Sequence, residues 1–252
     1  LQDFECLVVE DGADPETARV MLEVCAGDAR FVHLVLPHSG KPGRTRNAGL
    51  YRARGALCAF LDDDDLWLAP KLERQLAVLN AEPSLGLVCT RIEAFGARSG
   101  LWPHGVTPAE LSFAKLVTGN FVATSSVVAR RELLVDLGGF DETLERAQDY
   151  DLWLRFARRF KIRFVDEVLC RYRTHSGNIS DDRVRSLACV ERILRRLYAE
   201  QALGASPFYR RLASIQRERA SVEGGLKKRA YFRLAALGAT IRSRIAGLPG
   251  LS

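Results

Sequence analysis

In the first 95 residues, short apolar runs alternate with segments of helical spacing, and this alternation constrains the fold more than any other feature. Each run is of strand length and is bounded by turn-forming residues; the runs are CLVVEDG, FVHLVLP, ALCAFLD and LGLVCTRIEAF. Helical spacing occupies residues 44–55 and 70–81, and Pro70 stands near a helix start, where proline is tolerated. Alternating strands and helices predict βαβ units, and therefore an α/β fold with a mainly parallel sheet.

The pattern continues to about residue 180 and then changes. Residues 96–107 are typical of a loop, FVATSSVVAR and IRFVDEVLCRYR of strands, and QDYDLWLRFARRF of an amphipathic helix. Beyond Ser180 only helical patterns remain, over residues 183–202, 207–222 and 226–246. We therefore predict an α/β domain over residues 1–181 and a helical extension over residues 182–252.

Charge is divided unevenly between these two parts. Residues 183–252 contain 15 Lys and Arg but 4 Asp and Glu, a net charge of +11, which leaves −5 for residues 1–182. Such an extension can pack on its own domain, contact an anionic membrane surface, or bind nucleic acid. Helical apolar spacing favours the first two over nucleic acid; the spaced residues are Tyr231, Leu234, Leu237, Ile241 and Ile245.

Targeting signals and cysteine usage indicate the compartment. No stretch approaches the roughly 20 consecutive apolar residues of a membrane span, and the first residues do not resemble a secretory leader. The six cysteines are scattered without a CxxC pair, which favours free thiols over disulfides. We therefore expect a cytoplasmic protein, with peripheral contact to the inner face of the membrane as one possibility.

Four consecutive aspartates, residues 62–65, follow the apolar run ALCAFL. Adjacent carboxylates repel one another unless a cation or hydrogen-bond donors compensate. A divalent ion held by one or two carboxylates and by substrate phosphates is one compensation; a solvated acidic loop or a helix cap is the alternative. We favour the metal, because ligands of α/β sheets gather at the carboxyl ends of strands.

Two more segments are expected near the same edge of the sheet. Asp11 ends the first run, where an acid can accept hydrogen bonds from a nucleotide or simply form a turn with Gly12. GKPGRTRNAGL combines glycines and cations at a helix start, which suits a loop beside phosphates. Within it we expect Lys41 and Arg44 to be solvated and Arg46 to face the site.

The last two candidates are one carboxylate and one imidazole. Asp149 opens the helix QDYDLWLRF, where a carboxylate serves either as a cap or as a general base. His175, in RYRTHSGNIS, is either a ligand or an ordinary loop histidine. Spacing alone leaves both alternatives open.

Taken together, these segments resemble the family-two glycosyltransferases, which have the GT-A fold. The matching segments are LVVEDGA, RTRNAGLYRARGALCAFLDDDDLWLAPKL, LGGFDETLERAQDYDLWLRF and CRYRTHSGNIS. The resemblance implies a Rossmann-like, mostly parallel sheet flanked by helices, to which the helical basic extension is appended. Because family members begin with a strand that precedes the segment LVVEDGA, the resemblance also implies that the N-terminal first strand is missing.

The resemblance implies donor-binding roles for five residues. Asp11 matches an acid that contacts the nucleotide base, and Arg46 matches an arginine close to the nucleotide. Asp62 and Asp64 match the Asp-x-Asp signature, whose acids bind Mn²⁺ or Mg²⁺ and, through the metal, the donor diphosphate. Asp62 and Asp63 are also assigned to binding of the nucleotide sugar.

It further implies the reaction. Asp149 matches the aspartate that acts as general base, and His175 matches a histidine near the diphosphate, where it is a further metal ligand. The implied reaction is an inverting single displacement from a nucleoside diphosphate sugar to the hydroxyl of a saccharide or lipid-linked acceptor. Such a reaction belongs to synthesis of bacterial cell-envelope polysaccharides or glycolipids.

Two other functions compete with this hypothesis. Sugar-1-phosphate nucleotidyl transfer requires a glycine-rich phosphate loop near the N-terminus, and none is visible. A catalytically silent module that only binds sugar nucleotides is favoured by Gln148, which stands where the family has a glutamate beside the base.

Overall fold

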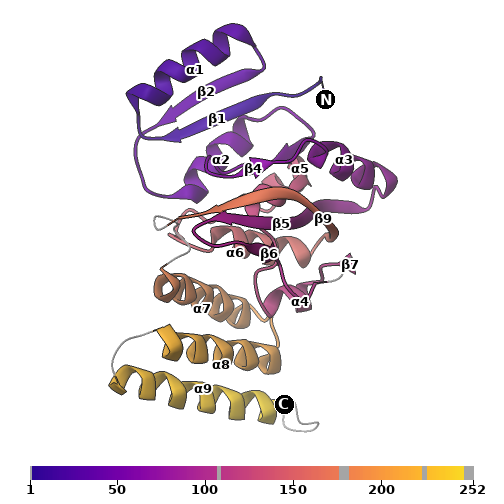
Figure 1. Cartoon of the computed structure of the whole chain (residues 1–252). Helices are drawn as coiled ribbons and strands as arrows, with labels where there is room; N and C mark the ends of the chain where they lie inside the picture. Colours follow the sequence, from indigo (N-terminus) through magenta and orange to yellow (C-terminus); the bar gives the residue numbers. More distant parts are fainter. Residues whose placement is uncertain (1, 107–108, 176–181, 223–225, 247–252) are drawn as a thin grey trace. The chain divides into compact units, whose positions relative to one another are not determined.

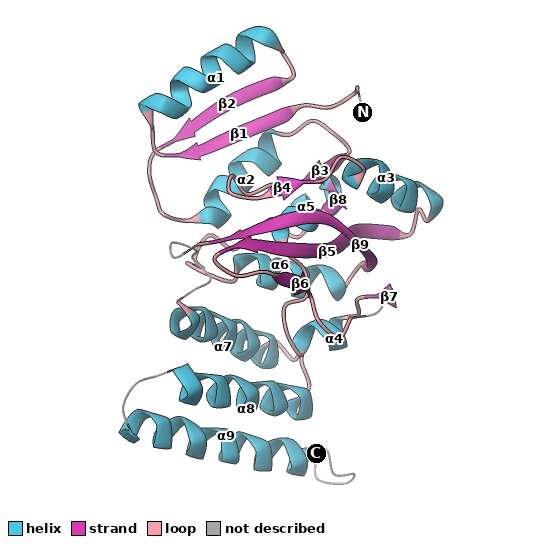
Figure 2. Cartoon of the chain, in the orientation of Figure 1, coloured by secondary structure: helices cyan, strands magenta, loops and turns pink. Residues whose placement is uncertain are grey.

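The structure is a computed structural model that describes residues 2–106, 109–175, 182–222 and 226–246 (Figure 1). Its contacts divide the chain into two compact units, Leu1–Ser176 and Gly177–Ser252. The first contains sheets and helices, and the second contains helices (Figure 2). We call them the α/β unit and the helical unit.

The α/β unit begins with two parallel strands, β1 (Cys6–Asp11) and β2 (Phe31–Leu36), joined by helix α1 (Pro15–Gly27). Asp14 caps α1, since its carboxylate accepts a hydrogen bond from the Thr17 N–H at 2.7 Å. Both strands run in register and end together, so Asp11 lies beside Leu36. Within the described residues β1 pairs only with β2, which leaves this sheet separate from the larger one.

A seven-stranded sheet forms the rest of the framework. Its order is β3-β8-β5-β9-β4, with β6 added to β5 and β7 added to β9. The long strands β5 and β9 pair in parallel, whereas the remaining pairings are antiparallel and short. The prediction of an α/β fold is confirmed, and both long pairings, β1 with β2 and β5 with β9, are parallel. The strands are β3 (Leu57–Ala59), β4 (Leu66–Trp67), β5 (Leu85–Gly96), β6 (Gly100–Trp102), β7 (Ala109–Glu110), β8 (Val128–Arg130) and β9 (Lys161–Thr174).

Helices pack against this framework and complete the core. Leu79 of α3 packs with Leu85, Val88 and Val128 of the sheet, and all four are almost fully buried. Helix α6 buries Trp153 and Phe156 on its apolar face, as its spacing predicted. The helices are α2 (Pro42–Arg52), α3 (Lys71–Ala81), α4 (Phe113–Val117), the 3-10 helix η1 (Thr124–Ser126), α5 (Arg131–Asp136) and α6 (Gln148–Ala157).

Two local predictions were only partly right. FVATSSVVAR forms the 3-10 helix η1 followed by the short strand β8, because the Ser126 hydroxyl hydrogen-bonds the Ala123 carbonyl at 2.7 Å and competes with strand pairing. The stretch 96–107 is not all loop, since β6 forms a hairpin with β5 there.

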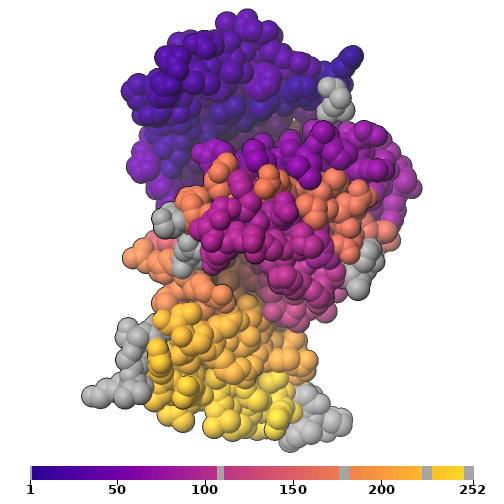
Figure 3. Space-filling model, viewed as in Figure 1, coloured from indigo at the N-terminus to yellow at the C-terminus, as the bar shows by residue number. Residues whose placement is uncertain are grey.

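The helical unit consists, in its described residues, of α7 (Arg183–Ala199), α8 (Ala205–Val222) and α9 (Leu226–Ala246), close to the predicted ranges. α8 and α9 lie side by side and form one continuous surface (Figures 1 and 3). Tyr198 of α7 stacks on Phe208 of α8 with ring centroids 4.4 Å apart. None of the helices in the described ranges is both long and apolar enough to cross a membrane.

Candidate functional site

The four aspartates form a tight turn between β3 and β4, which we call the aspartate loop (residues 62–65). The Asp65 N–H donates to the Asp62 carbonyl at 3.1 Å and closes the turn. Ser125 of η1 holds the loop from outside, because its hydroxyl accepts the Asp62 N–H at 3.0 Å and its carbonyl accepts the Trp67 indole N–H at 2.7 Å. The unexpected 3-10 helix therefore fixes the loop on which the site depends.

Two carboxylates of the aspartate loop face cationic or potentially cationic side chains. The Arg46 guanidinium donates to Asp62 Oδ1 at 2.6 Å, and both side chains are mostly buried. His175 Nε2 lies 3.1 Å from Asp64 Oδ2. The structure thus brings together four residues that the sequence singled out, whereas Asp63 of the same loop is exposed.

Asp65 turns away from this group and ties the loop to β9. Asp65 is only 5% exposed, and its Oδ1 accepts a hydrogen bond from the Arg173 backbone N–H at 2.9 Å. The Arg173 guanidinium in turn donates to the Asp64 carbonyl at 3.0 Å. Burial raises the pKa of the Asp65 carboxyl to about 6, against the opposing effect of its hydrogen bonds. Asp65 therefore holds the aspartate loop beside the segment that carries His175.

Arg46 is positioned through its neighbour Asn47. The Asn47 side chain hydrogen-bonds both backbone groups of Phe140, at 2.8 and 2.9 Å. This contact needs Gly139, whose φ is +64° and where an added Cβ would lie 2.4 Å from Asn47 Oδ1. These contacts therefore join the segments RNAG and GGF, which are widely separated in sequence, and fix their positions relative to each other.

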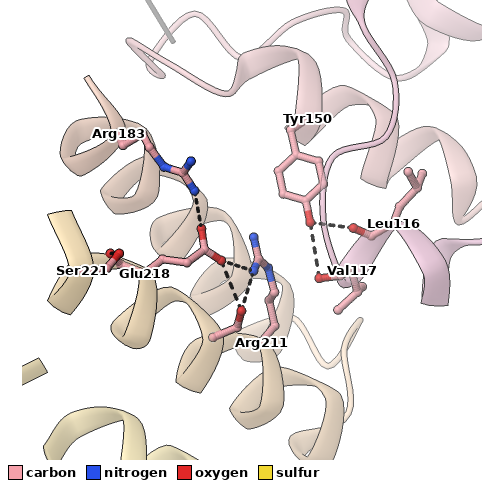
Figure 4. Close-up of polar contacts among 8 residues, drawn as sticks. Leu116, Val117, Tyr150, Arg183, Arg211, Glu218 and Ser221 are labelled. Carbon is pink, nitrogen blue, oxygen red and sulfur yellow. Dashed lines mark hydrogen bonds and ion pairs between the residues drawn. The ribbon is translucent and has the colours of Figure 1, made fainter. Parts of the chain in front are cut away.

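Asp149 lies in the first turn of α6, with Ala147 as the N-cap residue. Tyr150 fixes this turn, since its hydroxyl donates to the Leu116 carbonyl at 2.6 Å (Figure 4). The Asn120 amide donates to Asp149 Oδ2 at 3.1 Å. Burial raises the pKa of the Asp149 carboxyl, while Arg46 and Asn120 oppose the shift. A carboxylate with a raised pKa is a stronger base, which suits general base catalysis.

Gln148, beside Asp149, is buried against the start of α2. Gln148 is only 5% exposed, and a Cβ added to Gly43 of α2 would lie 3.3 Å from the Gln148 Cγ. The amide is neutral, so it places no second negative charge beside Asp149. Having Gln148 in place of a glutamate therefore removes one negative charge from the surroundings of Asp149.

Asp11 occupies the end of β1, as predicted, but its carboxylate is engaged locally. It accepts hydrogen bonds from the N–H and hydroxyl of Ser39, at 2.8 and 2.9 Å, and from the N–H of Gly40 at 2.7 Å. Burial alone would raise the pKa of the Asp11 carboxyl, but these hydrogen bonds outweigh it and hold that pKa below its usual range. In the described part of the chain, no hydrogen bond or ion pair joins Asp11 to the aspartate loop.

The predicted metal ligands do not form one cluster. Within the described residues, no group of three His, Cys, Asp or Glu side chains is placed to hold a metal ion together. Of the predicted set, Asp62 is ion-paired with Arg46, while Asp64 and His175 lie side by side. One carboxylate and one imidazole fit Mn²⁺, and the carboxylate fits Mg²⁺, when phosphates and water supply the remaining ligands. Asp64 and His175 therefore fit a metal site to which the protein contributes two ligands.

Sequence reasoning missed several residues that support the site: Ser39, Asn120, Ser125 and Arg173. Asn120 and Ser125 lie in or just before a segment interpreted as a plain strand, and spacing did not connect either to a carboxylate. Arg173 lies in the segment CRYRTHSGNIS, and the charged residue two positions before His175 was a signal that could have been used.

Comparison with known proteins gives a consistent picture. The family model described as Glycosyl transferase family 2 matches residues 1–138. The UDP-Glc:alpha-D-GlcNAc-diphosphoundecaprenol beta-1,3-glucosyltransferase WfgD of Escherichia coli is 27% identical over 187 residues, 73% of this chain and 71% of that protein. The uncharacterized glycosyltransferase RP339 of Rickettsia prowazekii is 28% identical over 193 residues, 74% of this chain. The match spans only 59% of RP339.

Solved structures share the fold. TarS 1-349 of S. aureus, in complex with UDP-GlcNAc, matches with a TM-score of 0.71 at 20% identity, over 96% of this chain and 72% of that one. The mannosyltransferase PcManGT from Pyrobaculum calidifontis, in complex with GDP-Man and Mn²⁺, matches with a TM-score of 0.57 at 15% identity, over 97% and 79% of the two chains. These likenesses show the GT-A glycosyltransferase fold.

Proposed function

This chain belongs to glycosyl transferase family 2, and from that premise we propose that it transfers a sugar from a nucleoside diphosphate sugar to an acceptor hydroxyl with inversion. The observation that supports this proposal most is the convergence of the Arg46–Asp62 and His175–Asp64 pairs on one loop. Asp149 is close enough for its pKa to respond to both Arg46 and Asp62.

The donor diphosphate is proposed to bind beside the aspartate loop. Arg46 offers a planar guanidinium that Asp62 already holds in place, and such a group recognises phosphate oxygens well. Asp64 and His175 would hold Mn²⁺ or Mg²⁺. When bound, the cation supplies positive charge that offsets the charge developing on the departing diphosphate. TarS with UDP-GlcNAc and PcManGT with GDP-Man and Mn²⁺ support this class of donor.

Asp149 is proposed to act as the general base. Its carboxylate takes the proton of the acceptor hydroxyl as the oxygen attacks the anomeric carbon and the bond to the diphosphate breaks. The Asn120 amide keeps one carboxylate oxygen oriented, and Tyr150 anchors the turn that carries Asp149. One displacement of this kind inverts the anomeric configuration without a covalent intermediate on the enzyme.

The acceptor is proposed to be a lipid-linked saccharide of the cell envelope, met by a cytoplasmic enzyme at the membrane surface. WfgD, which this chain resembles, is a glucosyltransferase whose acceptor is a diphosphoundecaprenol-linked sugar. In the helical unit, α9 exposes an apolar stripe, with Leu234 at 69% exposure and Leu237 at 57%, within a basic segment. Apolar residues bordered by arginines suit an anionic membrane surface.

Product analysis tests this function. The full chain is incubated with Mn²⁺, a lipid diphosphate-linked saccharide and a panel of nucleoside diphosphate sugars, and nucleoside diphosphate release is measured with and without acceptor. We expect acceptor-dependent release with one donor, and proton NMR of the product should show the anomeric configuration opposite to that of the donor. Retention would contradict the single displacement. Donor binding without release under any condition would instead support a silent binding module.

A further inference from the structure

The arginines of α8 fall into two groups. Arg211 donates to Glu218 at 3.1 Å, and Arg183 of α7 donates to the same carboxylate at 3.2 Å (Figure 4). Arg219 pairs with Glu191 at 3.0 Å. The arginines on this side of α8 are therefore neutralised within the helical unit.

Arg210 and Arg217 lie on another side of α8. They are seven residues apart and so share one face of the helix, and Arg244 joins them from α9. Together they line a cavity of about 380 Å³ between α8 and α9, to which Ser206, Thr240 and Ser243 add hydroxyl groups. Ala213, which stands between the two α8 arginines, also lines the cavity. Its side chain is small enough to leave the space open.

This cavity has an excess of positive charge. No acidic residue lines it, and in the described ranges no carboxylate forms an ion pair with Arg210, Arg217 or Arg244. Arg217 donates to the Thr240 hydroxyl at 3.4 Å, which directs the guanidinium across the cavity toward α9. Three like charges around one space repel one another unless an anion joins them.

We propose that this cavity binds a phosphate or diphosphate group. Guanidinium groups bind phosphate oxygens through paired, charge-assisted hydrogen bonds, and the volume is sufficient for such a group. Arg244 lies one turn after Ile241 on the same side of α9, so the cavity borders the exposed apolar stripe. The phosphate can thus belong to a lipid headgroup or to a soluble anion.

The experiment compares single charge removals in the full chain. Arg217→Gln and Arg244→Gln each remove one arginine from the cavity, whereas Arg233→Gln removes an exposed arginine of α9 that does not line it. Binding is measured by calorimetry with inorganic pyrophosphate and by sedimentation with phosphatidylglycerol vesicles. Excess EDTA prevents anion binding through a metal at the aspartate loop, and circular dichroism checks the fold.

We expect each cavity variant to weaken binding roughly tenfold relative to Arg233→Gln, and Arg217→Lys to recover part of the loss. A loss with pyrophosphate assigns a soluble anion, and a loss with vesicles alone assigns a lipid headgroup. Equal binding by the cavity variants and Arg233→Gln, or no binding to either probe, would overturn the proposal. Because neither probe requires donor binding or transfer, failure here leaves the proposed reaction untouched.

Discussion

The α/β unit and the helical unit place their cations differently. In the α/β unit, Arg46 faces Asp62, Arg155 faces Asp151, and Lys71 is fully buried. In the helical unit, Arg210 and Arg217 stay exposed beside a cavity without a carboxylate partner among the described residues. Arg46 is held by an acid of the candidate site, whereas Arg210 and Arg217 have no carboxylate partner among the described residues and are available to ligands from outside. The comparison supports the proposals of catalysis in the first unit and of attachment through the second.

The largest expected effect is on transfer. Asp149→Asn removes the proposed base but keeps a side chain of the same size, so we expect transfer to fall by a factor on the order of 10²–10⁴ with donor affinity retained. Arg233→Gln, which removes an exposed cation of the helical unit that does not line the cavity, should leave transfer unchanged. Initial rates and donor titrations on both variants check this. A parallel loss of donor binding in Asp149→Asn would identify Asp149 as a structural residue.

The next effect is on stability and concerns the buried cation. Lys71 Nζ has no hydrogen-bond partner among the described residues and lies 4.2 Å from the Trp67 ring centroid. Burial lowers the pKa of Lys71 from 10.5 to about 7. Between these values the unfolded chain binds a proton that the folded chain does not, so this group costs stability at and below pH 7 and the cost disappears toward pH 10.

Lys71→Met should therefore raise the free energy of unfolding at pH 7 by about 3–5 kcal/mol, and the gain should shrink as pH approaches 10. Arg233→Met removes an exposed cation of the helical unit and should change stability by less than about 0.5 kcal/mol. Urea unfolding at several pH values measures both. A gain that is independent of pH would contradict the lowered pKa of Lys71 in the folded chain.

A third effect concerns attachment through the apolar stripe of α9. Leu234 in α9 and Leu22 in α1 are both exposed, at 69% and 74%. We expect Leu234→Gln to weaken binding to anionic vesicles roughly tenfold, because it removes apolar area that would be buried in the bilayer surface. Leu22→Gln, in the α/β unit, should have no effect. Binding of the unmodified chain should also weaken as salt screens the basic residues, and equal losses in the two variants would reject this surface.

The smallest effect is a shift in pH dependence. The Asn120 amide favours the charged form of Asp149 and so lowers the pKa of that carboxyl. Asn120→Ala should raise the pKa, and the acid limb of the transfer rate should move to higher pH. The pH profile of kcat measures the shift. A limb displaced to lower pH would contradict the assigned hydrogen bond.

Much of this fold could be predicted because the relevant signals are local. The runs CLVVEDG and FVHLVLP correspond to β1 and β2, and the helical spacing beyond residue 182 corresponds to α7, α8 and α9. The serine-rich segment around Ser126 could not be assigned in this way. Its hydroxyl forms a short-range hydrogen bond that competes with strand pairing, and apolar periodicity does not report such a bond.

The sequence predicted which residues belong to the candidate site, but not which of them contact one another. Contacts such as that of Arg173 with Asp65 join residues more than a hundred positions apart, and they depend on β9 lying beside β4. The opposite orientations of Asp64 and Asp65 depend on the turn within the aspartate loop. Helical spacing indicated an amphipathic α9, but the cavity depends on how α9 packs on α8.

Calorimetric titration of UDP or GDP into the chain, with and without Mn²⁺, tests the central claim most directly. Asp64→Ala removes the carboxylate beside His175, and Asp136→Ala removes an exposed carboxylate of α5 as the matched control. We predict that the unmodified chain and Asp136→Ala bind a nucleoside diphosphate in an Mn²⁺-dependent manner, and that Asp64→Ala loses this dependence while remaining folded. Unchanged Mn²⁺-dependent affinity in Asp64→Ala would contradict the assignment of the aspartate loop as the donor site.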